Sequence, residues 1–121
     1  MDARLREGIR LFNEGRFFES HEVLESFYHE TAATNKPFLE GLIQLTAALR
    51  IFVDFGEIQG PARMVRQALI RFENYQPAFL QVRVKELCEA MEAWAKETEA
   101  KAAPPPSSIP KIQLQGSGFF S

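Results

Sequence analysis

The stretch FLEGLIQLTAALRIFV, from Phe38 to Val53, decides the fold. When it is plotted with the periodicity of a helix, apolar side chains cover almost the whole circumference. Only four polar side chains interrupt them: Glu40, Gln44, Thr46 and Arg50. A helix that is apolar nearly all round is covered by its neighbours in the folded protein. The stretch therefore predicts a central helix around which the other helices pack.

Gly41, within this stretch, and Pro37, directly before it, give further information. Gly41 lies inside the predicted helix, where a glycine costs about 1 kcal/mol relative to alanine. We therefore expect Gly41 to mark the close approach of a second helix. Pro37 suits the first turn, because the backbone N–H that proline lacks has no partner there.

Four further segments have apolar residues at helical spacing, and breaks separate them. They are residues 2–14, residues 17–33, the segment from Pro61 to the break at 74–77, and residues 78–100. The short link at Gly15 predicts that the first two form an antiparallel hairpin. No segment alternates with the period of a strand, except in part residues 111–115. The sequence predicts an all-α protein, a compact multihelical bundle of about five helices with an antiparallel helical hairpin at the N-terminus.

The composition changes after residue 100. We assign residues 1–100 to a single helical domain, and residues 101–121 to a Pro-rich linker and an apolar C-terminal tail. The tail is more apolar than free disorder favours, through Ile109, Ile112, Leu114, Phe119 and Phe120. Two interpretations stay open: the tail lies along a groove of its own bundle or of a partner, or it is a frayed end.

Length and charge restrict the class of protein. The chain has 121 residues, 45% of them hydrophobic and 25% charged, which is typical of one globular domain. A net charge of −2 gives no overall attraction to nucleic acid or to an anionic membrane. The single cysteine, Cys88, excludes an internal disulfide, and the charged start has no signal-peptide pattern. The central helix is too polar to span a bilayer. We expect a cytoplasmic protein that does not act on membranes or nucleic acid.

Three polar residues stand out because they lie among apolar ones, two of them in residues 17–33 and one in the central helix. His21 and Glu25 are one helical turn apart, at a spacing that allows a hydrogen bond between them. A histidine oriented by a carboxylate is also an ordinary acid–base pair. Gln44 lies among small and apolar residues of the central helix. Because buried polar groups need partners, we expect His21, Glu25 and Gln44 to belong to one or two buried hydrogen-bond networks.

Two interpretations of this network stay open. In the functional one, a small polar pocket lies between residues 17–33 and the central helix. His21 acts there as acid, base or ligand, Glu25 is its partner, and Gln44 binds a molecule. In the structural one, the network only fixes the register of the helices. A basic set, Arg50 with Arg63, Arg66 and Arg71, can hold a phosphate, but a solvated face balanced by acids is the simpler interpretation.

The sequence does not favour a metal site. The segment HEVLE is similar to the zinc motif HExxH, but its last position is Glu25. His29 is two turns from His21, so one ion cannot easily bind both on a straight helix. Cys88 is the only soft ligand and lies on an apolar stripe, where it acts as a small hydrophobe. The sequence also lacks GxxxxGK[ST], GxGxxG, CxxC and GxSxG. We expect no metal and no cofactor.

Three segments resemble a small prokaryotic family known as domain of unknown function 309. They are FNEGRFFESHEVLE at 12–25, FLEGLIQL at 38–45 and GEIQGPA at 56–62. The family pattern is FNxGxFxExHExLE, a GLIQ-type helix and a GNxxGA turn, and the resemblance covers about Leu5 to Ala95. It implies a compact helical bundle, often self-associating, without an assigned activity.

The resemblance also singles out individual positions. The motif residues correspond here to His21, Glu22, Glu25, Gly41 and Gln44. This chain departs from the pattern at three positions. The family commonly has Trp where this chain has Tyr28, often His where it has Arg50, and usually Asn where it has Glu57.

We expect a helical binding or interaction module that self-associates, as a homodimer, and that binds a small molecule or a protein partner. The alternative is a small hydrolase-type enzyme that uses His21 and Glu25 as acid and base or as metal ligands. The candidate catalytic residues are His21 and Glu25. The candidate binding residues are Gln44, Glu22, Tyr28 and Arg50.

Overall fold

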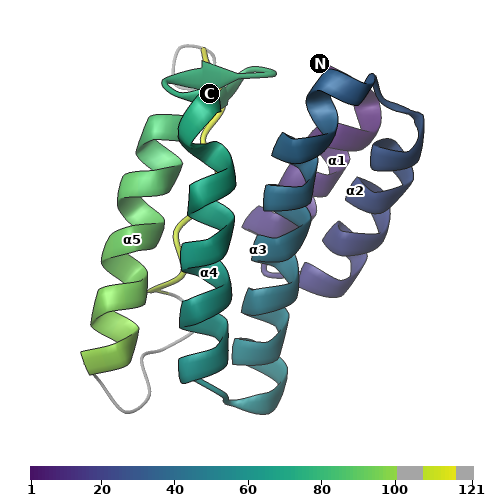
Figure 1. The fold of residues 1–121 in the computed structure, drawn as a ribbon. Helices are drawn as coiled ribbons and strands as arrows, with labels where there is room; N and C mark the ends of the chain where they lie inside the picture. Colours follow the sequence, from purple (N-terminus) through teal and green to yellow (C-terminus); the bar gives the residue numbers. More distant parts are fainter. Residues whose placement is uncertain (101–107, 117–121) are drawn as a thin grey trace.

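Five α-helices make up most of the computed structural model, which describes residues 1–100 and 108–116 (Figure 1). They are α1 (Ala3–Asn13), α2 (Phe17–Glu30), α3 (Lys36–Phe55), α4 (Gln59–Phe72) and α5 (Val84–Ala100). Two 3₁₀ turns, η1 (Ala33–Asn35) and η2 (Glu73–Tyr75), precede α3 and follow α4. No helix in these ranges is long and apolar enough to cross a membrane.

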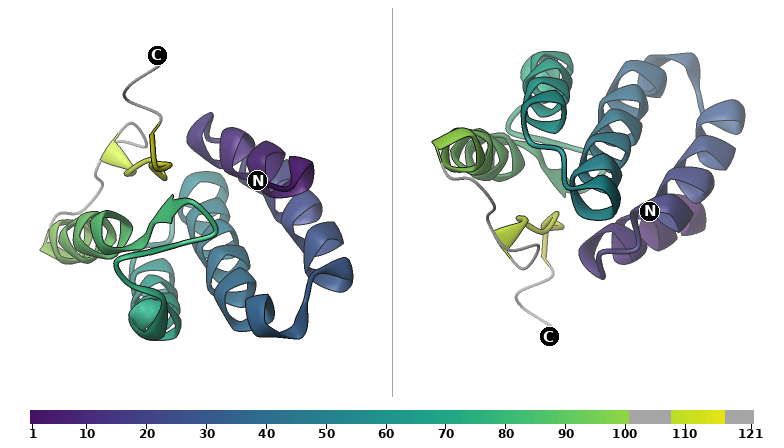
Figure 2. Two further views of the ribbon diagram at one scale, coloured as in Figure 1. Left: turned by 90° about the horizontal axis from the view of Figure 1, so that it is seen from above. Right: turned by 90° about the horizontal axis from the view of Figure 1, so that it is seen from below.

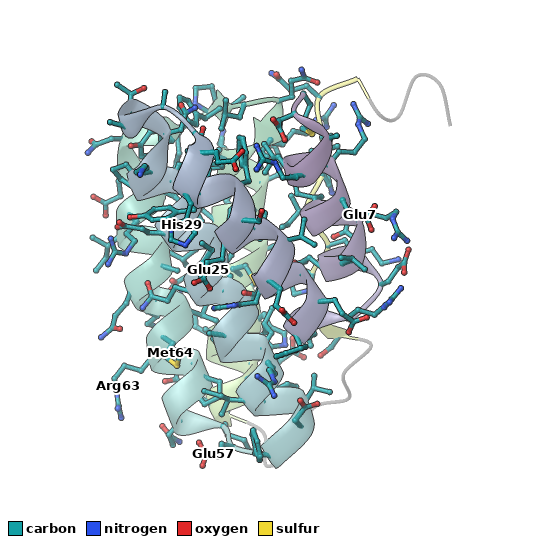
Figure 3. All side chains as sticks on the ribbon, turned by 90° about the vertical axis from the view of Figure 1, so that its right-hand side faces the viewer. Glu7, Glu25, His29, Glu57, Arg63 and Met64 are labelled. Carbon is teal, nitrogen blue, oxygen red and sulfur yellow. The ribbon has the colours of Figure 1, made fainter. Side chains whose placement is uncertain are left out.

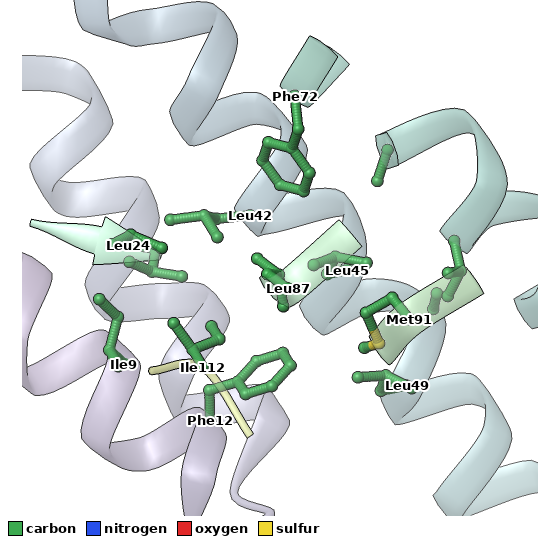
Figure 4. Close-up of a cluster of buried hydrophobic side chains, with 14 of the residues drawn as sticks. Ile9, Phe12, Leu24, Leu42, Leu45, Leu49, Phe72, Leu87, Met91 and Ile112 are labelled. Atoms are coloured by element: carbon green, nitrogen blue, oxygen red, sulfur yellow. The ribbon is translucent and has the colours of Figure 1, made fainter. Parts of the chain in front are cut away.

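Each helix packs mainly on the one before it and the one after it in the chain, and α3 lies in the middle of the row. Its residues Leu42, Leu45 and Leu49 are fully buried, and Figure 4 shows them between side chains of the flanking helices. This arrangement confirms the all-α fold, the N-terminal hairpin and the central position of the stretch 38–53.

Gly41 lies where α3 meets α4. A Cβ atom built on Gly41 would lie 2.6 Å from the ring of Phe72, which is itself fully buried. Real Cβ atoms do not approach a neighbour so closely, so only glycine allows the two helices this spacing. The expected close helix approach at Gly41 is confirmed.

The segment after α4 differs from the expectation. Residues 78–83, which the sequence suggests are the start of the last helix, form a small antiparallel hairpin of β1 (Ala78–Phe79) and β2 (Val82–Arg83). Leu80 and Gln81 form its turn with φ of 48° and 67°. Two left-handed residues in a row cannot continue a helix, so α5 begins only at Val84. The prediction of a helix over 78–83, and of no strand there, was wrong.

The described part of the tail packs against its own bundle. In the two end-on views of Figure 2 it lies between α1 and α5 and closes the row of helices. Ile112 is only 3% exposed, and Leu114 forms an antiparallel bridge with Val82. Of the two open interpretations, docking on its own bundle applies to residues 108–116. Phe119 and Phe120 lie outside the described residues.

Candidate functional site

Two pockets follow each other between α2 and α3, and both are lined by Ala47. We call them together the α2–α3 groove. The first, the His21 pocket, has a volume of about 330 Å³ and is lined by Phe18, His21, Thr46, Ala47, Arg50, Ile51 and Phe55. The second, the Gln44 pocket, has a volume of about 370 Å³ and is lined by Glu25, Tyr28, His29, Glu40, Ile43, Gln44, Ala47 and Arg71.

The His21 pocket combines apolar walls with two basic side chains. Phe18 and Phe55 are unusually exposed for their type, at 48% and 68%. The guanidinium carbon of Arg50 lies 4.6 Å from the centre of the Phe18 ring, a cation–π contact. Arg50 Nε also donates to Asp54 Oδ2 over 3.4 Å. These contacts hold the guanidinium at the rim of the pocket that His21 also lines.

Glu25 lies between two histidines on the same face of α2. Its Oε2 is 3.5 Å from His21 Nδ1, and its Oε1 is 3.8 Å from His29 Nε2. In Figure 3, Glu25 and His29 point away from α1, where Glu7 lies. The Glu25 side chain is 50% exposed and that of His21 34%. The expectation that these two residues form a buried network was therefore wrong, because the turn of α2 that carries them borders an open groove.

Gln44 projects from α3 into the second pocket without contacting His21. Its Nε2 donates to Gln67 Oε1 of α4 over 3.1 Å. Its Oε1 is shielded from solvent and has no hydrogen-bond partner among the described residues. A buried acceptor without a donor costs free energy, about 1–3 kcal/mol, unless a ligand supplies the donor. Of the one or two networks expected for His21, Glu25 and Gln44, the structure shows two separate groups: the pair of His21 and Glu25, and the amide of Gln44.

Glu40 joins α2 to α4 at the far end of the groove. The hydroxyl of Tyr28 donates to Glu40 Oε1 over 2.8 Å, and Arg71 donates to Glu40 Oε2 over 2.7 Å. The hydrogen bond to the Glu40 carboxylate, with a smaller effect of desolvation, raises the pKa of Tyr28. The phenol therefore stays protonated and keeps donating to Glu40.

The other candidate residues have simpler surroundings. Glu22 is exposed and lines neither pocket of the groove. Three arginines of the basic set are paired with acids: Arg50 with Asp54 over 3.4 Å, Arg66 with Glu99 over 2.6 Å, and Arg71 with Glu40. These pairs agree with the simpler interpretation of a balanced, solvated face.

The described residues offer no group of three or more His, Cys, Asp or Glu side chains that could hold a metal ion. His21, Glu25 and His29 follow one another at successive turns of α2 and do not surround one point. Cys88 is half-buried, and burial raises the pKa of its thiol, which keeps it neutral. This environment agrees with the interpretation of Cys88 as a small hydrophobe.

Sequence reasoning missed several residues that shape the groove. Phe18 follows Phe17 directly, and consecutive side chains of a helix point about 100° apart; Phe17 is buried, whereas Phe18 is 48% exposed. Glu40 was visible as a charge within the most apolar helix. That it contacts Arg71, 31 residues further along the chain, could not be seen from spacing within one helix.

The comparison with known families agrees with the family resemblance. The family described as a domain of unknown function (DUF309) matches residues 5–64, which hold most of α1, all of α2 and α3 and the start of α4. The match begins at the expected residue and ends before the expected Ala95. No protein among those with curated descriptions matches the chain. With His21, Glu25 and Gln44 all inside the matched segment, the chain belongs to the DUF309 family.

Proposed function

We propose that this protein is a binding module that holds a small organic acid in the α2–α3 groove. The observation that carries the proposal is the presence of His21 and Arg50 in a pocket whose other walls are largely apolar. Binding pockets for small molecules are typically apolar concavities with a few convergent polar groups. A guanidinium and an imidazole beside two phenylalanine rings suit a carboxylate attached to an apolar or aromatic body.

The electrostatic arrangement supports an anionic ligand. Arg50 is permanently charged, and its guanidinium is held by the Phe18 ring and by an exposed ion pair with Asp54. Glu25 Oε2 lies 3.5 Å from His21 Nδ1, so a carboxylate orients the imidazole at the edge of the pocket. The second pocket adds Gln44 Oε1, an acceptor that is shielded and unpartnered.

The test is a titration with small aromatic carboxylates such as benzoate and phenylacetate, followed by two-dimensional NMR. We expect saturable shifts at residues of the His21 pocket. Arg50→Gln and His21→Ala are each expected to weaken binding by about tenfold, as for the loss of a charged hydrogen bond.

Arg63→Gln is the matched control, because Arg63 is an exposed arginine of α4 that lines neither pocket of the groove. Its binding is expected to equal that of the unaltered chain. If Arg50→Gln and Arg63→Gln weaken binding equally, only general charge is involved and the proposal fails.

A hydrolase that uses the same groove is the second candidate, favoured by the 3.5 Å separation of His21 Nδ1 and Glu25 Oε2. Glu25 would orient the imidazole, and His21 would take a proton from an attacking water. Thr46 is not the nucleophile, because its buried hydroxyl donates to the Ile43 carbonyl over 2.6 Å. Turnover of a panel of nitrophenyl esters that Glu25→Gln lowers, with benzoate as a competitive inhibitor, would favour this candidate over simple binding.

Self-association as a homodimer and a cytoplasmic location stay predictions. So does the absence of action on nucleic acid.

A further inference from the structure

The described tail, residues 108–116, crosses a groove between α1 and β2 that is separate from the α2–α3 groove. We call it the tail groove and define it by Ile9, Phe12, Asn13, Gln81, Val82 and Arg83. We propose that the tail groove is a binding site for an extended peptide, and that it takes this segment from a second copy of the chain as well as from its own. A second copy would then complete the site in its partner.

Asn13 binds the main chain of the segment at two points. Its side-chain NH₂ donates to the Ile112 carbonyl over 2.9 Å, and its Oδ1 accepts from the Ile112 N–H over 2.7 Å. Both backbone polar groups of one residue are thereby satisfied by a single side chain. A clamp of this kind recognises extended backbone, whatever side chain that residue carries.

The edge of the small sheet binds the residues that follow. Arg83 N–H donates to the Gln113 carbonyl over 2.9 Å, and Gln115 N–H donates to the Gln81 carbonyl over 2.8 Å. Leu114 pairs with Val82 as an antiparallel bridge. The tail therefore pairs with the edge of the small sheet through backbone hydrogen bonds, and pairing with a sheet edge is a recurrent way for proteins to bind peptides.

Side-chain selectivity comes from the alternation along the segment. Ile112 points inward and is 3% exposed, and Figure 4 shows it beside Ile9 and Phe12 of α1. Its neighbours Lys111 and Gln113 are exposed. An extended peptide presents alternate side chains to opposite sides, so the groove selects a branched apolar residue at the position of Ile112 and tolerates others beside it.

These contacts join parts of the chain that are far apart in sequence. Asn13 and Ile112 are separated by 99 positions, and the groove residues come from the first helix and the hairpin. A second copy carries the same segment and the same groove, and so the same contacts can form between two chains. Exchange of an identical element between protomers is a low-cost route to a dimer, because it needs no new interface chemistry.

The test uses two full-length variants with complementary defects. Asn13→Ala removes the side chain that binds the tail but leaves the tail unaltered. Ile112→Ser removes the buried side chain of the tail but leaves the tail groove unaltered. In a mixture, the tail of the first can enter the groove of the second. Native mass spectrometry distinguishes the species, because the two substitutions give different masses. We expect the mixture to form a heterodimer. Each variant alone should form much less homodimer.

A labelled synthetic peptide of residues 108–116 gives the second readout. We expect it to bind the full-length Ile112→Ser chain at least about tenfold more tightly than the unaltered chain, whose own tail competes. Gln113→Ser is the matched control, since Gln113 is an exposed neighbour, and it should behave as the unaltered chain. Absence of a heterodimer together with no peptide binding overturns the proposal. Homodimers as abundant as the heterodimer also overturn it, because they indicate another interface.

Hydrogen exchange on the unaltered chain decides the matter if either variant fails to fold. A segment that acts as a separable ligand opens without unfolding the bundle. The Ile112 and Gln115 amides are then expected to exchange at least about tenfold faster than the buried amides of α3. Equal protection of both sets, at the level of global unfolding, would mean that the tail is a fixed part of the core and would overturn the proposal.

Discussion

At the scale of single residues, Gly41 sets the distance between α3 and α4. In Gly41→Ala, overpacking is expected to lower the free energy of unfolding by about 1–3 kcal/mol. The better helix propensity of alanine offsets up to about 1 kcal/mol of this loss. The added Cβ would lie 2.6 Å from Phe72, a rigid ring with no room to move. Urea unfolding followed by circular dichroism measures the change.

Gly60→Ala is the control, because its Cβ would meet nothing closer than a flexible Glu57 oxygen at 3.8 Å. This variant should be neutral or slightly more stable than the unaltered chain. An equal loss in both variants would contradict the role given to Gly41.

Tyr28 and Glu40 give a prediction about pH. The pKa of Tyr28 lies above its ordinary value, mainly because the phenol donates to the Glu40 carboxylate. The neutral phenol is the favoured form in the fold. The contribution of this hydrogen bond to the free energy of unfolding is fully present below the ordinary pKa of tyrosine, about 10. It is lost as the pH rises through the raised pKa of Tyr28. Glu40→Gln should lower the pKa of Tyr28 toward its ordinary value.

Ultraviolet absorbance measures this titration, with Tyr75→Phe as the background so that one tyrosine is observed. An exposed acid elsewhere, changed as Glu22→Gln, is the control and should leave the pKa of Tyr28 unaltered. No difference between the two variants would mean that the bond to Glu40 is not kept in solution.

At the scale of elements, the hairpin of β1 and β2 turns through two residues that rarely adopt the conformation of its turn. Leu80 and Gln81 both have positive φ, a conformation that costs non-glycine residues about 1–2 kcal/mol each. Gln81→Gly is therefore expected to raise the free energy of unfolding by about 1 kcal/mol, because glycine adopts this conformation readily. The Gln81 carbonyl that accepts from Gln115 is kept.

Thermal unfolding by calorimetry measures the gain. The comparison variant is Gln113→Gly, at an exposed position without positive φ, which should lose stability instead. A lower melting temperature for Gln81→Gly would contradict the role of the turn.

The same hairpin indicates where sequence reasoning reached its limit. The helices could be predicted because each has several turns of apolar periodicity, as in residues 38–53. The hairpin has two strands of two residues each, too short for any alternation, and Leu80 and Val84 fall by chance at helical spacing. The turn also lacks the Asn and Gly that usually mark it, so the signal that distinguishes a hairpin from a helix start was missing.

The candidate site was predictable in part for a similar reason. Spacing within α2 placed His21 and Glu25 side by side, and the structure brings them within 3.5 Å. Spacing within one helix could not predict how exposed these two side chains are, because their exposure depends on how closely α2 packs against α3. The partners from other helices, such as Gln67 for Gln44, depend on tertiary packing that no single helix encodes.

At the scale of the whole molecule, the tail closes the row of helices. Deletion of residues 108–121 is expected to lower the free energy of unfolding by about 2 kcal/mol or more, because burial of an isoleucine alone contributes about 1.5–3 kcal/mol. The loss would also expose Val82 and leave Asn13 without its main-chain partners. Urea unfolding tests this. Gln113→Ala is the control and should change the value by less than about 0.5 kcal/mol. An unchanged midpoint after deletion would make the tail a passive appendage.

The packing of each helix on its chain neighbours has a consequence for the speed of folding. Contacts between consecutive helices are close in sequence, and chains rich in such contacts fold in microseconds to milliseconds. The contact between Asn13 and Ile112, 99 positions apart, requires closure of nearly the whole chain and costs the most loop entropy. We therefore expect the helical row to form first and the tail to enter last. Each refolding event would then include an interval in which a complete bundle exists with its tail groove empty.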